Sequence, residues 1–232
     1  MAKMVLYKKR RPARRGGRGG RKYRVKKYNN VGTLIADKTK ITMKYAADLT
    51  LTVDGAVGAN YLFRCNSIHD PDQSGVGHQP KGSDQYETFY KRYCVIGSKI
   101  TIRFAGSGSS ESTVDPNNIT NVGITTIDSV ASTILTPVEF MESNRTSYSV
   151  ITPQKPTTTI TKYFSPKEFF GIKDVLDDGA IQAAFGNNPF NEAFWQVKAW
   201  PDPNGALNRR ISMNVMIQYI VVLRERQPIG TS

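Results

Sequence analysis

Residues 41–53 alternate between apolar and polar side chains, and this pattern constrains the fold more than any other feature of the sequence. Every odd position is apolar, and the even positions are polar except for one alanine. A period of two places successive side chains on opposite faces, which predicts a β-strand with one buried face and one face in water. The apolar positions are Ile41, Met43, Tyr45, Ala47, Leu49, Leu51 and Val53.

The same period recurs in residues 100–104 and 211–223. The second of these segments is apolar on both faces from Tyr219 onward, which indicates a central strand of a sheet. Long polar loops, notably 105–118 and 201–209, separate further strand candidates. Many strands with long connections and few helices predict an all-β fold built as an antiparallel sandwich. The shorter candidates are Asn60–Asn66, Asn121–Ile127, Ser147–Thr152, Thr157–Phe164 and Phe194–Trp200.

Two short helices are also predicted. Asp84 and Glu87 form a start similar to a capping box, and an aromatic stripe follows at helical spacing. Such a stripe could stack bases, but core packing is its commoner use. Ser165 is a suitable capping residue, because Pro166 follows it and Glu168 stands three residues after it. The aromatic stripe consists of Tyr86, Phe89, Tyr90 and Tyr93.

The positive charge of the chain is concentrated at one end. Of the 32 Lys and Arg residues, 13 lie in residues 1–27, which contain no Asp or Glu. The other 19 basic residues balance the 19 acidic ones, so residues 28–232 have no formal net charge. A segment this basic, with few apolar side chains to bury, is not expected to fold by itself. We predict a disordered basic arm at 1–27, a linker at 28–40 and one folded domain at 41–232.

Several motifs in the arm indicate nucleic acid as its partner. Residues 8–11 have the composition of a nuclear localisation signal, residues 15–20 contain two Arg-Gly-Gly repeats, and Tyr23 and Tyr28 offer rings for base stacking. No helix suited to reading a groove is evident, so we expect contacts to phosphates that depend on salt. The predicted nucleic-acid-binding residues are Lys8, Lys9, Arg10, Arg11, Arg14, Arg15, Arg18, Arg21, Lys22, Arg24, Lys26 and Lys27, of which Lys8, Lys9, Arg10 and Arg11 form the localisation signal.

Catalytic chemistry has few candidate residues. Both histidines, His69 and His78, lie in a loop at 66–82 that is rich in Gly and Asp, and their spacing matches no familiar metal site. We interpret this loop as a special backbone conformation at a subunit contact. Cys65 and Cys94 have no second pair nearby to complete a zinc site, and we expect both to be buried. We predict no catalytic residue, no metal and no cofactor, and hence no enzyme.

No segment has the features of an export signal or a membrane anchor. The longest strongly apolar run, 219–223, has five residues where a membrane-spanning helix needs about twenty. We therefore expect a soluble protein made in the cytosol, without membrane insertion.

The chain resembles the capsid proteins of circovirus-like viruses, which have small circular single-stranded DNA genomes. The likeness is most specific in an Asn-Ser-Ile-x-Asp-Pro-Asp turn, a Gly-His-Gln-Pro loop, an Asp-Gln pair and a Gly-Ser-Lys-Ile strand, and a Tyr-Phe-Ser-Pro-Lys turn is similar as well. These are residues 66–72, 77–80, 84–85, 97–100 and 163–167. The final strand also matches in character.

The resemblance implies an eight-stranded antiparallel jelly roll of the viral capsid type. It further implies a T=1 icosahedral shell of 60 copies, arms turned inward onto the viral single-stranded DNA genome, and a location in the virion and the host nucleus. The implied partners are other copies of the chain, the genome, a host nuclear import receptor and a cell-surface attachment factor.

Two other functions remain compatible with these features. A capsid protein of a small single-stranded RNA virus would share the arm and the jelly roll. A cellular nucleic-acid-binding protein, or a lectin or enzyme with a β-sandwich and a basic tail, would differ in staying monomeric or forming a small oligomer.

Overall fold

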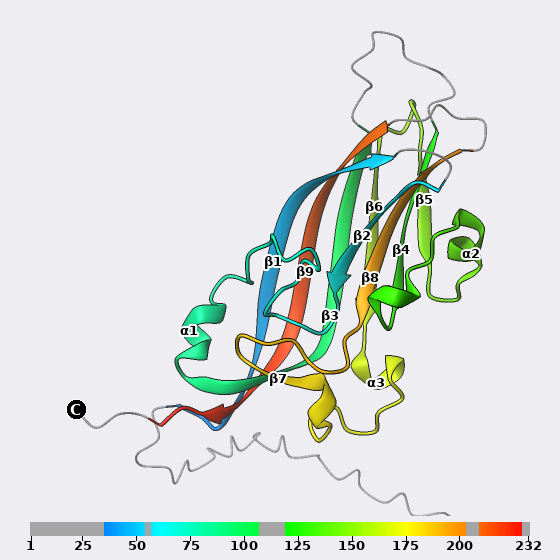
Figure 1. The fold of residues 1–232 in the computed structure, drawn as a ribbon. Helices are drawn as coiled ribbons and strands as arrows, with labels where there is room; N and C mark the ends of the chain where they lie inside the picture. Colours follow the sequence, from blue (N-terminus) through cyan, green and yellow to red (C-terminus); the bar gives the residue numbers. More distant parts are fainter. Residues whose placement is uncertain (1–34, 54–56, 107–118, 203–208, 229–232) are drawn as a thin grey trace, which may run out of the picture. The chain divides into compact units, whose positions relative to one another are not determined.

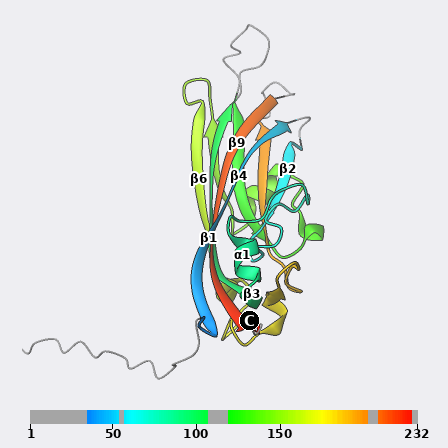
Figure 2. The same ribbon diagram turned by 90° about the vertical axis from the view of Figure 1, so that its left-hand side faces the viewer.

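The computed structural model describes residues 35–53, 57–106, 119–202 and 209–228 of the chain. The arm and most of the predicted linker lie outside these residues. The strands are β1 (Lys38–Val53), β2 (Ala59–Arg64), β3 (Tyr90–Gly106), β4 (Thr120–Ile127), β5 (Ser147–Ile151), β6 (Thr157–Phe164), β7 (Gln182–Ala184), β8 (Phe194–Pro201) and β9 (Arg209–Arg226). Within the described residues they form two antiparallel sheets that face each other (Figures 1 and 2).

The order of the strands identifies the fold. The first sheet has the order β1-β9-β3-β6, with the short β7 paired to β3, and the second has the order β2-β8-β4-β5. The chain crosses from one sheet to the other after β1, β2 and β3, and again after β5, β7 and β8. Leaving aside the three-residue β7, eight antiparallel strands in two sheets with these crossings form a jelly roll. The predicted fold class is therefore confirmed for the described part of the chain.

The predicted strands agree closely with the observed ones. β6 spans the predicted residues, and 100–104 is part of the longer β3. β1 begins at Lys38, three residues earlier than predicted and inside the segment assigned to the linker. β9 pairs with β1 on one side and with β3 on the other, which confirms the central position inferred from its apolar faces.

Side chains from the facing sides of the two sheets form one core. Along β1 the odd-numbered residues are buried or partly buried and the even-numbered ones are exposed, as the alternation predicted. Tyr45 of β1 and Tyr219 of β9 belong to the same core cluster as Trp195 of the second sheet. Cys65 and Cys94 are both free thiols and both buried, as expected.

The aromatic stripe after Asp84 was wrongly interpreted as helical. Helix α1 covers only Ser83–Glu87, and it is capped by Gly82, whose φ of 93° suits glycine, and not by an acidic side chain. Tyr90 and Tyr93 lie in β3 and pair with β9, opposite Arg226 and Leu223. Long-range strand pairing thus outweighs the local helical spacing.

The remaining helices are short. Helix α3 (Pro166–Phe169) starts as predicted, because the Ser165 hydroxyl oxygen accepts a hydrogen bond from the Glu168 N–H. Helix α2 (Pro137–Glu142) and the 3₁₀ turns Val130–Ser132 and Gly179–Ile181 were not predicted. Among the described residues no helix is long and apolar enough to span a bilayer.

The outer face of the second sheet is covered by residues 128–142, which include α2 (Figure 1). Phe140 of α2 packs edge-on against Trp200 of β8, with ring centroids 5.5 Å apart. Gln196 of β8 donates from Nε2 to the Ile134 carbonyl at 2.6 Å and accepts from the Ile134 N–H at 2.9 Å. The side chain of Gln196 thus pairs with this covering segment much as a neighbouring strand would.

Lys198 is fully buried beneath the same covering segment. Its Nζ donates to the Leu135 carbonyl at 2.7 Å and lies 3.4 Å from Oδ1 of Asn60. Neither partner is charged, so burial is not offset by an anion, and it lowers the pKa of Lys198 from 10.5 to about 8. Between about pH 8 and pH 10.5, Lys198 therefore holds its proton in the unfolded chain and has largely lost it in the folded chain.

We predict that this protein gains stability on going from pH 7 to pH 9.5 relative to a Lys198→Met variant. Because the folded pKa is depressed, stability rises with pH in this window, by on the order of 2 kcal/mol. Thermal or guanidinium denaturation at several pH values measures the difference. Parallel pH profiles for the two proteins would contradict the prediction, since every other titrating group is common to both.

Candidate functional site

The twelve arm residues predicted to bind nucleic acid, Lys8 to Lys27, lie outside the described residues, and so does the predicted nuclear localisation signal. The candidate site that the structure does describe is the loop of residues 66–82, which contains both histidines. We call it the histidine loop. It lies between β2 and α1, beside β1 (Figure 1).

Arg64, at the end of β2, fixes the start of the histidine loop. Its Nε donates to Glu192 at 2.7 Å, and one terminal nitrogen donates to the Asp70 carbonyl at 2.9 Å and lies 3.3 Å from the Asp70 carboxylate. The Arg64 side chain is only 11% exposed. This arginine therefore neutralises two carboxylates that are themselves partly buried.

Residues 70–73 extend the second sheet beyond β2. The Arg64 N–H donates to the Pro71 carbonyl at 2.8 Å, and the Gln73 N–H donates to the Leu62 carbonyl at 3.2 Å. Phe63 and Asp72 form an antiparallel bridge between these two segments. The loop thus pairs with the edge of β2 and covers part of it.

Asp72 is buried within the loop, and both of its oxygens are occupied. Oδ2 accepts from the Tyr61 hydroxyl at 2.6 Å, and Oδ1 accepts from the Ser74 N–H at 2.9 Å and the Ser74 hydroxyl at 2.7 Å. Burial, followed by this hydrogen bond to Asp72, raises the pKa of Tyr61. The carboxylate stabilises the turn and has no accessible oxygen left for acid–base work.

His78 packs the end of the loop onto β1. Its two ring nitrogens lie 2.8 Å from the Gln79 carbonyl oxygen and 3.0 Å from the Ala46 carbonyl oxygen. Its ring lies 4.8 Å from the ring of Tyr45, whose pKa is raised to about 12, chiefly by burial. A Cβ at Gly77 would stand 2.9 Å from the Tyr45 hydroxyl, so this close approach requires glycine.

The Asn-Ser pair at the start of the loop joins it to residues 187–193. Asn66 donates to the Asn191 carbonyl at 2.7 Å and accepts from the Ala193 N–H at 3.0 Å. The Ser67 hydroxyl donates to Asn188 at 2.6 Å. These motif residues are fully buried and hold two loops together.

The described residues offer little for catalysis. No group of three or more His, Cys, Asp or Glu side chains among them is arranged to hold a metal ion. Burial raises the pKa of Cys65 well above its usual value and that of Cys94 to about 11, so neither sulfur is a ready thiolate. His69 contacts Gln79, with 3.2 Å between the side-chain nitrogens.

Sequence reasoning did not identify Arg64 or Glu192 as members of this site. They are 128 residues apart in the chain, and neither belongs to a recognisable motif. A usable signal was present for Arg64, because a charged residue ends a short apolar strand immediately before the Gly- and Asp-rich loop. No comparable signal marks Glu192.

Comparisons with known proteins give distant likenesses in structure alone. No protein-family model matches the chain, and no curated protein matches it in sequence. A chain in the structure of turnip yellow mosaic virus at 100 K is 12% identical, with 84% of this chain and 99% of that chain covered and a TM-score of 0.43. The decameric capsid protein of BFDV is 10% identical, with coverages of 81% and 99% and a TM-score of 0.42.

A chain in the structure of Cocksfoot mottle virus is 11% identical, with 82% of this chain and 95% of that chain covered and a TM-score of 0.45. Likenesses this distant do not indicate a function. The assignment of the jelly roll follows from the order of the strands in this chain itself.

We predict that an Arg64→Gln variant is less stable by roughly 3 kcal/mol, because two partly buried carboxylates lose their cation. The melting temperature should fall by about 6–12 °C in a chain of this size. Hydrogen exchange at the Gln73 amide should also quicken, since residues 70–73 are no longer held against β2. Arg103→Gln is the matched control, because Arg103 is exposed on β3 and forms no ion pair among the described residues. Equal melting temperatures for the two variants would contradict the prediction.

Proposed function

We propose that this chain is the capsid protein of a virus with a small circular single-stranded DNA genome. Sixty copies form a T=1 icosahedral shell, and the basic arm, residues 1–27, binds the packaged DNA. The observation that supports this most is the division of charge, in which a jelly-roll body without net charge follows a segment holding all thirteen net positive charges.

This division of charge suits a shell around a polyanion. A body with no net charge permits many copies to pack side by side without strong mutual repulsion, while the basic arm neutralises phosphates. The arm has no acidic residue to compete for its cations. The chain has no catalytic task in this proposal.

The resemblance to circovirus-like capsid proteins supports the choice of DNA. The motifs that carry it are spread over 66–167 and include the histidine loop. In the same proposal, Lys8, Lys9, Arg10 and Arg11 are recognised by a host nuclear import receptor, and the shell meets a cell-surface attachment factor. The protein then occurs in the virion and in the host nucleus.

The histidine loop is the part of the described surface that we assign to contacts between copies. Val76 in this loop is 87% exposed, and Phe190, in the segment to which the loop is bound, is 90% exposed. A neighbouring copy that covers these two side chains would remove their apolar surface from water, which favours association. The hydrogen bonds of Arg64, Asp72 and His78 hold the loop in a defined conformation, which lowers the entropy lost on assembly.

Assembly tests the proposal directly. Full-length protein mixed with single-stranded DNA should form closed particles visible by electron microscopy, because the body supplies the contacts between copies. A variant without residues 1–27 should still form shells, which are empty or poorly filled. If the full-length protein remains a monomer or a small oligomer under all assembly conditions, a cellular nucleic-acid-binding protein fits better. Particles from infected cells that contain RNA would instead favour an RNA virus.

The binding of nucleic acid tests the role of the arm. If about half of the arm's charges contact phosphates, log affinity should fall with log salt concentration with a slope of about −4 to −5. Scrambling the sequence of the oligonucleotide should hardly change the affinity. Changing Arg10, Arg11, Arg14 and Arg15 to Ala should flatten the slope. An affinity that ignores salt, or that falls a hundredfold on scrambling, would assign the binding to the folded body.

A further inference from the structure

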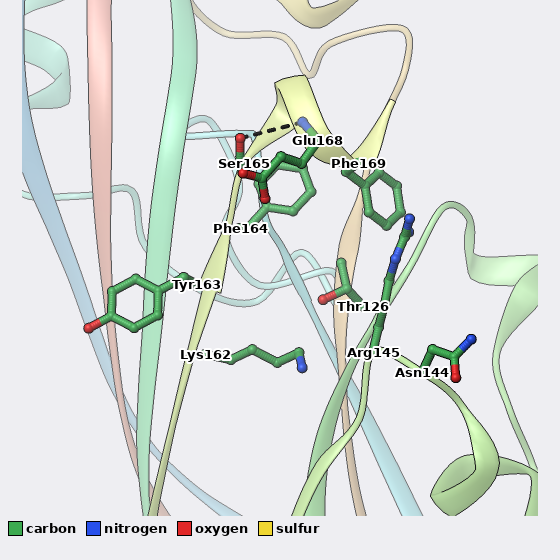
Figure 3. Close-up of a pocket in the computed structure, with 9 residues that line it drawn as sticks. All are labelled: Thr126, Asn144, Arg145, Lys162, Tyr163, Phe164, Ser165, Glu168 and Phe169. Atoms are coloured by element: carbon green, nitrogen blue, oxygen red, sulfur yellow. Dashed lines mark hydrogen bonds between the residues drawn. The ribbon is translucent and has the colours of Figure 1, made fainter. Parts of the chain in front are cut away.

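A hollow of about 270 Å³ opens where the two sheets come apart beside β6 (Figure 3). One side is formed by β6 and α3, and the other by the segment between α2 and β5 together with the end of β4. Lys162 and Arg145 extend from opposite sides, and Thr126 lies between them (Figure 3). This hollow is distant in sequence from the basic arm and from the histidine loop.

Lys162 occupies a position where its strand otherwise buries apolar residues. It alternates with Ile160 and Phe164, which are both buried in the core. Burial lowers the pKa of Lys162, and the positive charge of Arg145 lowers it further. Its Nζ has a long contact of 3.5 Å to the Ser147 hydroxyl oxygen. The ammonium group is therefore partly stripped of water and has no strong acceptor.

Arg145 brings a second cation to the same hollow. Its guanidinium lies 4.3 Å from the centre of the Phe169 ring, which holds it in place (Figure 3). Within the described residues, neither Arg145 nor Lys162 forms an ion pair, whereas Arg64 contacts two carboxylates. A guanidinium stacked in this way keeps its N–H donors free for a ligand.

The other polar groups that line the hollow are suited to an anion as well. The hydroxyls of Thr126 and Ser165 can donate, and the Ser165 oxygen already accepts from the Glu168 N–H at 3.5 Å. Glu168 also lines the hollow, but it is an exposed residue that forms no ion pair with either cation. The two cations thus outnumber the single carboxylate.

We propose that this hollow is a binding site for a phosphate or sulfate group. Lys162 and Arg145 donate to its oxygens from two sides, and Thr126 donates from between them. A tetrahedral oxyanion has acceptors in all three directions, whereas a planar carboxylate engages Arg145 alone in its preferred two-bond geometry. This site does not depend on the function proposed for the arm.

The test compares inorganic phosphate with sodium chloride at matched ionic strength and neutral pH, using full-length protein. Phosphate should raise the melting temperature, and calorimetry should give a binding isotherm with one site per chain in addition to the weak binding of the arm. Lys162→Met and Arg145→Gln should each weaken this binding at least about tenfold, as expected for the loss of one charged hydrogen bond. Lys99→Met, a cation on the opposite face of the same sheet, should leave it unchanged.

Two further ligands distinguish a phosphate from a sulfate as the natural ligand of the hollow. Ribose 5-phosphate carries a phosphate monoester and glucose 6-sulfate a sulfate monoester, each on a small sugar. The ligand with the lower dissociation constant identifies which of the two groups the hollow prefers. If the Lys162 variant does not fold, Arg145→Gln still tests the site, because it changes an exposed side chain. The proposal would be overturned if phosphate and chloride changed the melting temperature equally. It would also be overturned if Lys99→Met weakened phosphate binding as much as Lys162→Met and Arg145→Gln do.

Discussion

The pairing of β9 with strands on both of its sides is the interaction on which the rest of the structure depends. β9 runs beside all sixteen residues of β1, from Lys38 opposite Arg224 to Val53 opposite Arg209, and beside most of β3 on its other edge. Its inward side chains supply the middle of the core. A shift of one residue would turn those side chains toward solvent, so the register is fixed by burial. The second sheet then packs on a surface that β9 completes.

The sequence predicted most of the strands because the sandwich leaves one face of its first sheet exposed. That exposure produces the alternation seen in residues 41–53 and 211–223, and both segments are strands in the structure. Residues 195–199 of β8 alternate as well, but both faces of this strand are buried, so its polar side chains, Gln196 and Lys198, are covered and do not face water. Alternation does not indicate which strands pair. The jelly roll itself was expected from the family resemblance.

Features that depend on distant contacts were not predictable from local pattern. The aromatic residues from Tyr86 to Tyr93 fit a helical spacing, but pairing with β9 makes the second half of that segment a strand. Arg64 contacts Glu192 across 128 residues, and Lys162 lines the same hollow as Arg145, which lies in the segment between α2 and β5. Lys162 and Lys198 did carry a local signal, because each is a charged residue at a strand position where an apolar one is expected. Lys162 alternates with the apolar Ile160 and Phe164, and Lys198 lies in a strand whose residues are all buried. A charge at such a position indicates either a covered polar cluster, as at Lys198, or a site, as we propose for Lys162.

The central strand of the first sheet, β9, follows all the other described strands in the sequence. Roughly 170 residues separate the start of β1 from the start of β9, so at about 5–20 residues per second a ribosome needs on the order of 10–35 seconds between them. Throughout that interval β1 and β3 lack the neighbour that separates them, and their edges are open to other chains. β1 and β3 can therefore take their final places in the first sheet only late in synthesis, when β9 is available to lie between them.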